Sequence, residues 1–159
     1  ISVGSTPTAL FNLQIPGITE IRPGNYVFYD AIQVGLKVAG MDQCALQVVS
    51  TVISKPAQDR LVIDGGSKTF ALDKGAHGLS VVQGFGIIRG YPHLLLERLS
   101  EEHGIVKVQG EGPLPELGDE LCIVPNHACT AVNLANEVVV MKNGFVYDKW
   151  PVAARGLVQ

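Results

Sequence analysis

The first candidate for chemistry is the segment Pro125-Asn126-His127-Ala128-Cys129. A thiolate and an imidazole two residues apart can reach one ion if the backbone between them is extended or turned, and both bind zinc and similar borderline metals well. Since the segment supplies only two ligands, water and substrate would complete the coordination, as in a catalytic site. Two-ligand spacings are common by chance. The alternative is therefore a surface histidine and a half-buried cysteine that bind no metal.

Two small, polar segments near the start of the chain could cradle a phosphate. Residues 4–8 (GSTPT) offer hydroxyls and backbone N–H groups, and Gly24 and Asn25 offer the same after Arg22 and a rigid proline. Loops of this composition are usually plain turns, and an arginine is more often a surface residue than a ligand contact. Residue type alone does not decide between phosphate binding and plain turns, or between a ligand contact and a surface role for Arg22.

Three further residues have side chains that could take part in catalysis, but their sequence context favours structural or surface roles. His103 follows two glutamates in a predicted hairpin loop. This loop is a solvated turn, or in a minority interpretation it orients water or substrate beside the metal. Lys68 follows a Gly-rich turn without an apolar pocket to lower its pKa, which favours a surface or structural residue over a Schiff-base lysine. His77 is interpreted as a loop residue.

The elements that must position these groups are mostly β. Apolar runs rich in Val, Ile and Leu end at Gly- and Pro-containing turns, which predicts a barrel or a sandwich. Asn143-Gly144 predicts a tight hairpin, and one turn of helix is expected within residues 131–136. The strands are expected at residues 45–53, 60–64, 94–99, 105–108, 120–124, 138–141 and 145–150.

The first thirty residues differ from the rest of the chain. Their polar, backbone-exposing segments each lie beside an apolar stretch, which is typical of strand ends that meet a ligand. We therefore expect a boundary within residues 30–40, with one unit over residues 1–30 and a β domain carrying the metal segment over residues 31–159.

Composition limits the classes of protein that fit. The 159 residues are 47% hydrophobic and 17% charged, with a net charge of -3. This charge gives no footprint for nucleic acid or an anionic membrane, and no apolar run approaches the roughly 20 residues of a spanning helix. The three cysteines favour a reducing compartment, and therefore the cytoplasm. Cys44 and Cys122 lie in apolar runs and are expected in the core.

Taken together, these segments resemble the C-terminal part of the D-threonine aldolase and D-serine dehydratase family. This family, which includes 3-hydroxyaspartate dehydratases, belongs to the alanine-racemase-like, fold-type III pyridoxal-phosphate enzymes. The matching segments span most of the chain in the family's order. They are residues 4–8 (GSTPT), 19–30 (TEIRPGNYVFYD), 60–73 (RLVIDGGSKTFALD), 99–104 (LSEEHG), 118–133 (GDELCIVPNHACTAVN) and 147–156 (YDKWPVAARG).

The resemblance implies a fold and a set of site residues. Residues 1–30 would be the last strands of a TIM-type β/α barrel whose N-terminal bulk is absent from this chain, and a β-barrel or sandwich domain would follow. Ser5, Thr6, Gly24 and Asn25 would lie at the cofactor phosphate, with Arg22, by a looser correspondence, near the pyridine ring. His127 and Cys129 would bind the metal. The Schiff-base lysine is expected in the missing barrel, so no catalytic residue is assigned here beyond the candidate His103.

The implied function is a metal-assisted, pyridoxal-phosphate-dependent lyase acting on D-3-hydroxy amino acids. The first choice is a D-threonine aldolase, which yields glycine and an aldehyde; the second is a D-serine or 3-hydroxyaspartate dehydratase, which yields an oxo acid and ammonia. A thiolate ligand favours zinc, whereas such aldolases are associated with manganese, and magnesium is a third choice. A homodimer is expected, and this chain alone is expected to be inactive. If the natural chain is this short, the expectation becomes a non-catalytic metal-binding β module.

Overall fold

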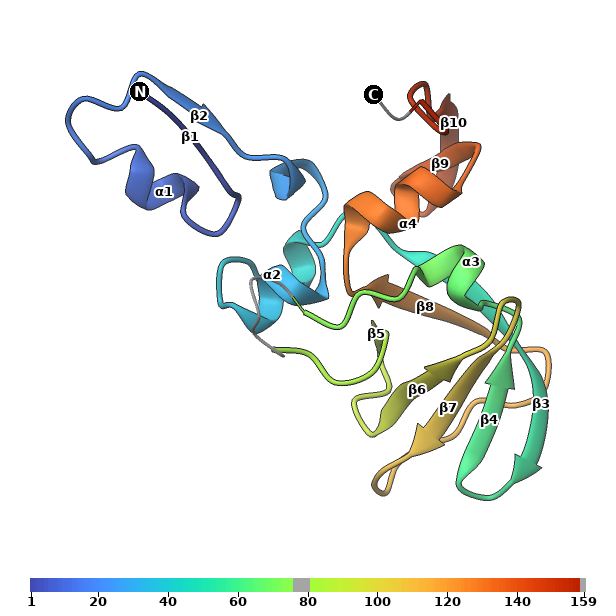
Figure 1. The fold of residues 1–159 in the computed structure, drawn as a ribbon. Helices are drawn as coiled ribbons and strands as arrows, with labels where there is room; N and C mark the ends of the chain where they lie inside the picture. Colours follow the sequence, from blue (N-terminus) through green and yellow to red (C-terminus); the bar gives the residue numbers. More distant parts are fainter. Residues whose placement is uncertain (76–80, 158–159) are drawn as a thin grey trace.

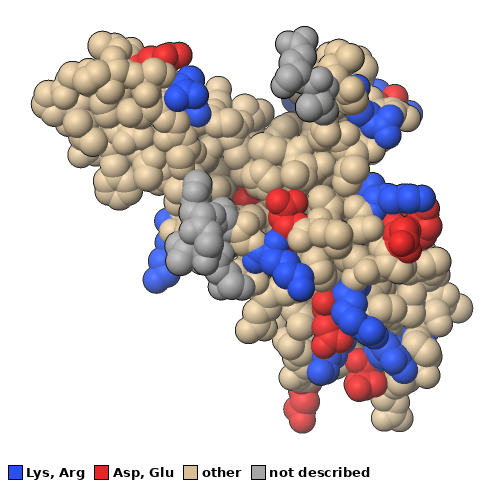
Figure 2. All heavy atoms as spheres, in the orientation of Figure 1, with Lys and Arg blue, Asp and Glu red and all other residues tan. Residues whose placement is uncertain are grey.

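The computed structural model describes residues 1–75 and 81–157, and His77 lies outside them. The predicted mostly β class is confirmed. Figure 1 shows a small N-terminal unit, a curved sheet, and a helix with a hairpin that projects beside it. Acidic and basic side chains are interspersed over the face of the sheet domain in Figure 2. Among the described residues, no helix is long and apolar enough to cross a membrane.

The N-terminal unit is a strand, a helix and a second strand. Strands β1 (Ser2–Gly4) and β2 (Glu20–Arg22) are parallel, and α1 (Ala9–Asn12) lies between them in the chain. Parallel neighbours need such a crossover, and repeated units of this kind build a β/α barrel. Three short helices then lead to the sheet: η1 (Asn25–Val27), α2 (Ala31–Gly35) and η2 (Met41–Gln43).

The main domain is a nearly closed barrel of six antiparallel strands. Their order is β5-β8-β3-β4-β7-β6. Phe85 N, just before β5, donates to Leu96 O in β6 at 2.9 Å, which brings the two edge strands together. The sequence predicts either a barrel or a sandwich, and the structure is therefore a barrel. The strands are β3 (Val48–Ala57), β4 (Arg60–Ile63), β5 (Gly86–Ile88), β6 (Leu94–Leu99), β7 (Gly104–Val108) and β8 (Glu120–Pro125).

Alternate residues of these strands fill the barrel interior, as the period of two requires. Leu96, Val106 and Ile123 are 0% exposed. Cys122, in contrast, is exposed on the outer face of β8 because its neighbours in the strand point inward, so its predicted core position was wrong. Cys44 is buried, as expected.

One end of the barrel is covered by α3 (Ser67–Phe70), which packs on the turn between β6 and β7. Ser67 N donates to Ser100 O at 2.8 Å. The backbones approach so closely that a Cβ atom on Gly66 would lie 2.4 Å from Glu101 O. Glycine is therefore required at this contact.

After β8 the chain forms α4 (Ala128–Leu134) and the hairpin of β9 (Glu137–Lys142) and β10 (Phe145–Pro151). The predicted Asn-Gly turn is confirmed, because Asn143 and Gly144 have φ values of 53° and 81°. The predicted helix is also present, but it begins at Ala128, three residues earlier than expected. The candidate metal segment is therefore the start of a helix.

Candidate functional site

His127 lies at the junction of β8 and α4, where it is the N-cap residue of the helix. Its Nδ1 atom is 3.2 Å from Asp30 Oδ2, and its side chain is 31% exposed. Since a carboxylate accepts hydrogen bonds, this contact places the ring proton on Nδ1. Nε2 then has a lone pair, and it has no hydrogen-bond partner among the described residues. The hydrogen bond to Asp30, opposed in part by burial, raises the pKa of His127.

Cys129 follows in the first turn of α4 and is exposed to solvent. Partial burial, together with the negative charges of Asp30 and Asp73, raises the pKa of its thiol. A metal at this position would have to displace a proton from the sulfur atom. Within residues 1–75 and 81–157, no group of three or more His, Cys, Asp or Glu side chains is placed to hold a metal ion.

Asp30 is the central residue of the site and is 0% exposed. Its Oδ2 atom accepts from Asn25 Nδ2 at 2.5 Å and from Ala128 N at 2.9 Å, besides the contact with His127. Its Oδ1 atom accepts from Gln33 N at 3.0 Å and so caps α2. Burial alone would raise the pKa of Asp30, but the hydrogen bonds outweigh burial and lower it. The residue is therefore a buried carboxylate with a full set of donors.

Asp30 was not among the residues predicted from sequence. A local signal for it exists: an aspartate before an apolar helix, with glutamine three residues later, matches a helix N-terminus. That signal indicates the cap to Gln33 and nothing more. The contacts with His127 and Ala128 join residues 97 and 98 positions apart, and no local pattern contains them.

The metal segment, residues 125–129, is also held by contacts with Asp73 and Gly84, besides those with Asp30. Asn126, which is 1% exposed, donates through Nδ2 to Asp73 O at 2.7 Å and to Gly84 O at 2.8 Å. Thr130 Oγ1 donates to Asp73 Oδ2 at 2.8 Å. These bonds fix the backbone on both sides of His127, so the ring of His127 is placed by buried neighbours.

The two candidate phosphate segments come together at the N-terminal unit. They follow the carboxyl ends of the parallel strands β1 and β2, and Asn25 N donates to the buried Thr6 Oγ1 at 2.9 Å. Ser5 has a φ of 86°, which is uncommon outside glycine, and its hydroxyl has no hydrogen-bond partner among the described residues. The space beside Gly24 is open. Barrel enzymes often bind phosphate at such loops and at the start of a short extra helix, here η1.

Asn25 connects these phosphate segments to the metal segment. Its backbone N–H contacts Thr6, and its side-chain amide contacts Asp30. Asp30 in turn contacts His127 and the N–H of Ala128. Two of the five candidate cofactor residues, Thr6 and Asn25, are therefore linked to the candidate metal ligand His127 through one buried carboxylate.

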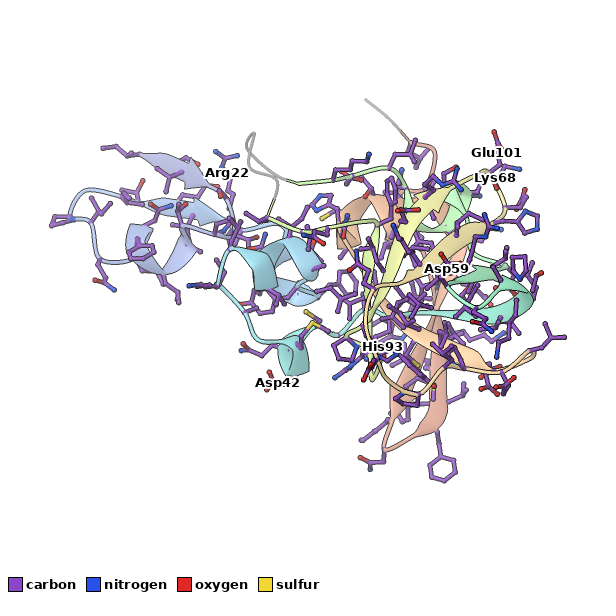
Figure 3. All side chains as sticks on the ribbon, turned by 90° about the horizontal axis from the view of Figure 1, so that it is seen from below. Arg22, Asp42, Asp59, Lys68, His93 and Glu101 are labelled. Carbon is purple, nitrogen blue, oxygen red and sulfur yellow. The ribbon has the colours of Figure 1, made fainter. Side chains whose placement is uncertain are left out.

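Arg22 and His103 are not part of this network. Arg22 is exposed, and its Nε atom donates to Ser2 Oγ at 2.8 Å across the N-terminal strand pair. The hydrogen bonds of His103 among the described residues join its backbone to Ser100 within the same turn. Lys68 forms an exposed ion pair with Glu102, as its surface interpretation predicts. Figure 3 shows Lys68 and Glu101 together, well away from Arg22.

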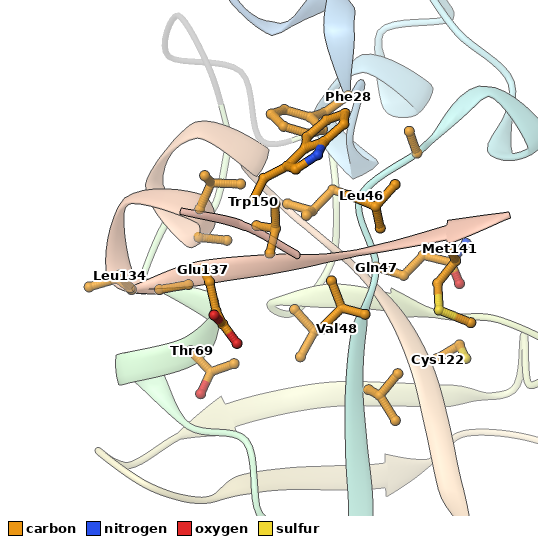
Figure 4. Close-up of a pocket in the computed structure, with 18 of the residues that line it drawn as sticks. Phe28, Leu46, Gln47, Val48, Thr69, Cys122, Leu134, Glu137, Met141 and Trp150 are labelled. Carbon is orange, nitrogen blue, oxygen red and sulfur yellow. The ribbon is translucent and has the colours of Figure 1, made fainter. Parts of the chain in front are cut away.

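A large groove lies elsewhere. It has a volume of about 1000 Å³ and separates the β9–β10 hairpin and α4 from the outer faces of β3 and β8 (Figure 4). Its walls are mainly apolar and include Phe28, Val48, Met141 and Trp150. None of the predicted metal or phosphate residues lines it, so the polar network and not this groove defines the candidate site.

Comparison with families and relatives agrees with the fold. The family described as "Putative serine dehydratase domain" matches residues 45–141. A D-threonine aldolase of Arthrobacter sp is 34% identical over 158 residues, which are 98% of this chain and 39% of that protein. An uncharacterized protein of Mycobacterium tuberculosis is 36% identical over 133 residues, which are 80% of this chain and 96% of that protein.

Solved structures give the same result. A D-threonine aldolase from Filomicrobium marinum has a TM-score of 0.83 at 26% identity, covering all of this chain and 42% of its own. D-threo-3-hydroxyaspartate dehydratase has been solved with a histidine replaced by alanine (TM-score 0.83) and, in a metal-free form, with a cysteine replaced by alanine (TM-score 0.82). Both variants are 30% identical over 95% of this chain and cover 42% and 43% of theirs. The two substituted residues are two positions apart.

The chain spans about two fifths of the length of the aldolases that it matches. It corresponds to their C-terminal part, as the resemblance implied. The matched fold and the matched sequence extend over the barrel and over the segment that begins α4. The chain belongs to the serine dehydratase domain family, whose members include D-threonine aldolases and D-serine dehydratases.

Proposed function

We propose that this chain is the metal-carrying part of a pyridoxal-phosphate-dependent lyase that acts on D-3-hydroxy amino acids, of the D-threonine aldolase type. The observation that carries the proposal is the buried network at Asp30. It joins a phosphate-type loop at Asn25 to a histidine with one ring nitrogen open at His127. A lyase of this kind needs a cofactor site and a Lewis acid within one active site.

His127, through Nε2, and Cys129, through its sulfur atom, would hold the metal. Metal-binding histidines commonly donate their other ring N–H to a carboxylate, and Asp30 accepts that bond here. The dehydratase variants add support, because the histidine and cysteine replaced in them have the spacing of His127 and Cys129, and the cysteine variant is a metal-free form. The thiolate ligand favours zinc, and manganese is the second choice.

Ser5, Thr6, Gly24 and Asn25 would hold the cofactor phosphate. The free hydroxyl of Ser5 and the open space beside Gly24 fit an anion bound by hydroxyl and backbone N–H groups. Arg22 is proposed to lie toward the pyridine ring, although its present contact is with Ser2. We place the boundary between the cofactor-binding unit and the β domain at residue 30.

When bound, pyridoxal phosphate supplies an electron sink for the substrate α-carbon, and the metal supplies a Lewis acid for the β-hydroxyl. The residues of this chain position that chemistry. His127 and Cys129 fix the metal ion, and Asp30 fixes His127. Thr6 and Asn25 would hold the phosphate group of the cofactor. The Schiff-base lysine is proposed to lie in a barrel outside this chain.

The rival within the same class is a D-serine or 3-hydroxyaspartate dehydratase, because one metal position serves both retro-aldol cleavage and loss of the hydroxyl group. The protein expressed from its complete gene should be assayed with D-threonine and with D-serine, in the presence of pyridoxal phosphate and metal. Glycine and acetaldehyde from D-threonine support the aldolase, and pyruvate from D-serine supports the dehydratase. If neither set of products forms, both assignments fail.

A candidate from another class is a non-catalytic metal-binding β module. The Mycobacterium tuberculosis relative favours it, because the alignment covers 96% of that protein and leaves little room for a second domain. The mass of the intact native protein separates the two classes: a chain of about this length supports the module. Light scattering of the same sample tests the proposed homodimer, and cell fractionation tests the proposed cytoplasmic location.

A further inference from the structure

The two oxygen atoms of Asp30 serve different parts of the molecule. Oδ1 accepts from Gln33 N, within the helix that Asp30 itself caps. Oδ2 accepts from Asn25 Nδ2, His127 Nδ1 and Ala128 N, and none of these atoms belongs to that helix. The helix cap and the contacts with the site are therefore separable, atom by atom.

We propose that Asp30 is the positioning residue of the metal site: its Oδ2 atom holds the imidazole of His127 with the proton on Nδ1 and Nε2 open to the metal. This inference rests on the proposed function, because it takes His127 as a metal ligand. It adds a residue that would never contact the metal itself. Asp30 acts through His127 and is kept apart from solvent by complete burial.

The geometry explains why a carboxylate is used at this position. Oδ2 faces three donors, and Oδ1 faces a fourth. Only an ionised carboxylate accepts at both oxygens, since an amide would present an NH₂ group to at least one of these donors. The second ring nitrogen of His127 is thereby fixed as an acceptor, which is the form that binds a metal.

The arrangement also ties the metal segment to the phosphate segments. Asn25 uses its backbone N–H for Thr6 and its side chain for Asp30, and Ala128 N reaches the same carboxylate oxygen as His127. Loss of the Oδ2 contacts would therefore free the imidazole ring and the start of α4 together. Loss of the Oδ1 contact would affect only the five-residue helix α2.

Two substitutions separate the structural role from the positioning role. Asp30→Ser keeps a hydroxyl that can cap α2, since serine is a good N-cap residue, but it is too short to reach His127. Asp30→Asn keeps the size and removes the charge. Asp64→Asn is the matched control, because Asp64 also accepts a side-chain and a backbone hydrogen bond, from Ser50 and Thr51, but at the barrel wall.

The first measurement is the affinity of each variant for Zn²⁺ alone, by competition with a chelating dye. The second is the tautomer of His127 in the metal-free protein, from the nitrogen chemical shifts of the ring, assigned by comparison with His127→Ala. We expect both Asp30 variants to bind zinc about 10- to 100-fold more weakly than wild type, the range found for partners of metal-binding histidines. Asp64→Asn should bind zinc with the affinity of wild type. The His127 tautomer with its proton on Nδ1, expected in wild type, should be lost in Asp30→Ser. Far-UV circular dichroism checks that each variant is folded.

The outcomes are distinct. A folded Asp30→Ser that keeps wild-type zinc affinity overturns the proposal, and so does weaker binding with an unchanged Nδ1–H tautomer. If neither Asp30→Ser nor Asp30→Asn folds, the tautomer of His127 in wild type tests the proposal. A ring proton on Nε2 in place of Nδ1 overturns the proposal. If wild type binds no zinc but its His127 tautomer depends on Asp30, the proposed metal site fails while the role of Asp30 in holding the ring stands.

Discussion

Replacement of Asn126 by alanine should destabilise the protein measurably. Asn126 is 1% exposed and lies between the end of β8 and the start of α4. Its side-chain amide donates to Asp73 O at 2.7 Å and to Gly84 O at 2.8 Å. With Thr130, it joins the metal segment to the chain around Asp73.

The magnitude follows from these two bonds. Each neutral hydrogen bond contributes about 1 kcal/mol net, and a buried carbonyl left without a partner costs about 1–3 kcal/mol. The side-chain oxygen Oδ1 of Asn126 has no partner among the described residues, so its removal adds no further loss. Because Asp73 and Gly84 are only partly buried, water can replace part of the lost bonding, and we expect Asn126→Ala to lower the free energy of unfolding by about 2–4 kcal/mol.

The assay is equilibrium unfolding in urea, followed by far-UV circular dichroism. With a typical slope of about 2 kcal/mol per molar urea, the midpoint should fall by about 1–2 M. Asn133→Ala is the matched control, since Asn133 is exposed on the same helix and alanine is the better helix former. That midpoint should stay the same or rise slightly. A loss below about 1 kcal/mol for Asn126→Ala would refute the reasoning.

Three further predictions concern the site and the barrel. Zinc affinity should weaken by about 10- to 100-fold per pH unit as pH falls below the raised pKa values of His127 and Cys129, because the metal must displace their protons. A zinc Kd that stays constant between about pH 8 and 6 would contradict this expectation. In buffers of different ionisation enthalpy, calorimetry should show proton release on zinc binding, and a buffer-independent heat would count against a thiolate ligand. Gly66→Ala should cost about 1–3 kcal/mol of stability because its Cβ would overlap Glu101 O, whereas Gly110→Ala, with its nearest contact at 3.5 Å, should be tolerated in the same thermal melt.

Most of the barrel could be predicted from the sequence because its signals are local. Residues 94–99 form β6 as expected, and the positive φ values of Asn143 and Gly144 follow from residue type. The short strand β5 (Gly86–Ile88) was missed, since three residues between glycines carry little pattern. Cys122 was misplaced because an apolar run on a strand does not reveal which face is inside.

The sequence proposes candidate residues for the site but does not show how they are joined. His127, Cys129 and the segments at Thr6 and Asn25 were proposed from residue type and resemblance. The carboxylate that joins them was not, because Asp30 meets His127 only when β8 and α4 have folded against α2. A buried polar network of this kind depends on contacts between distant parts of the chain.

Zinc content tests whether His127 and Cys129 bind a metal. Wild type and the His127→Ala/Cys129→Ala double variant should be dialysed against the same Zn²⁺ buffer and measured by mass spectrometry, with circular dichroism to check that both are folded. We expect about one zinc ion per wild-type chain and almost none in the double variant. Equal zinc content in the two folded proteins would contradict it.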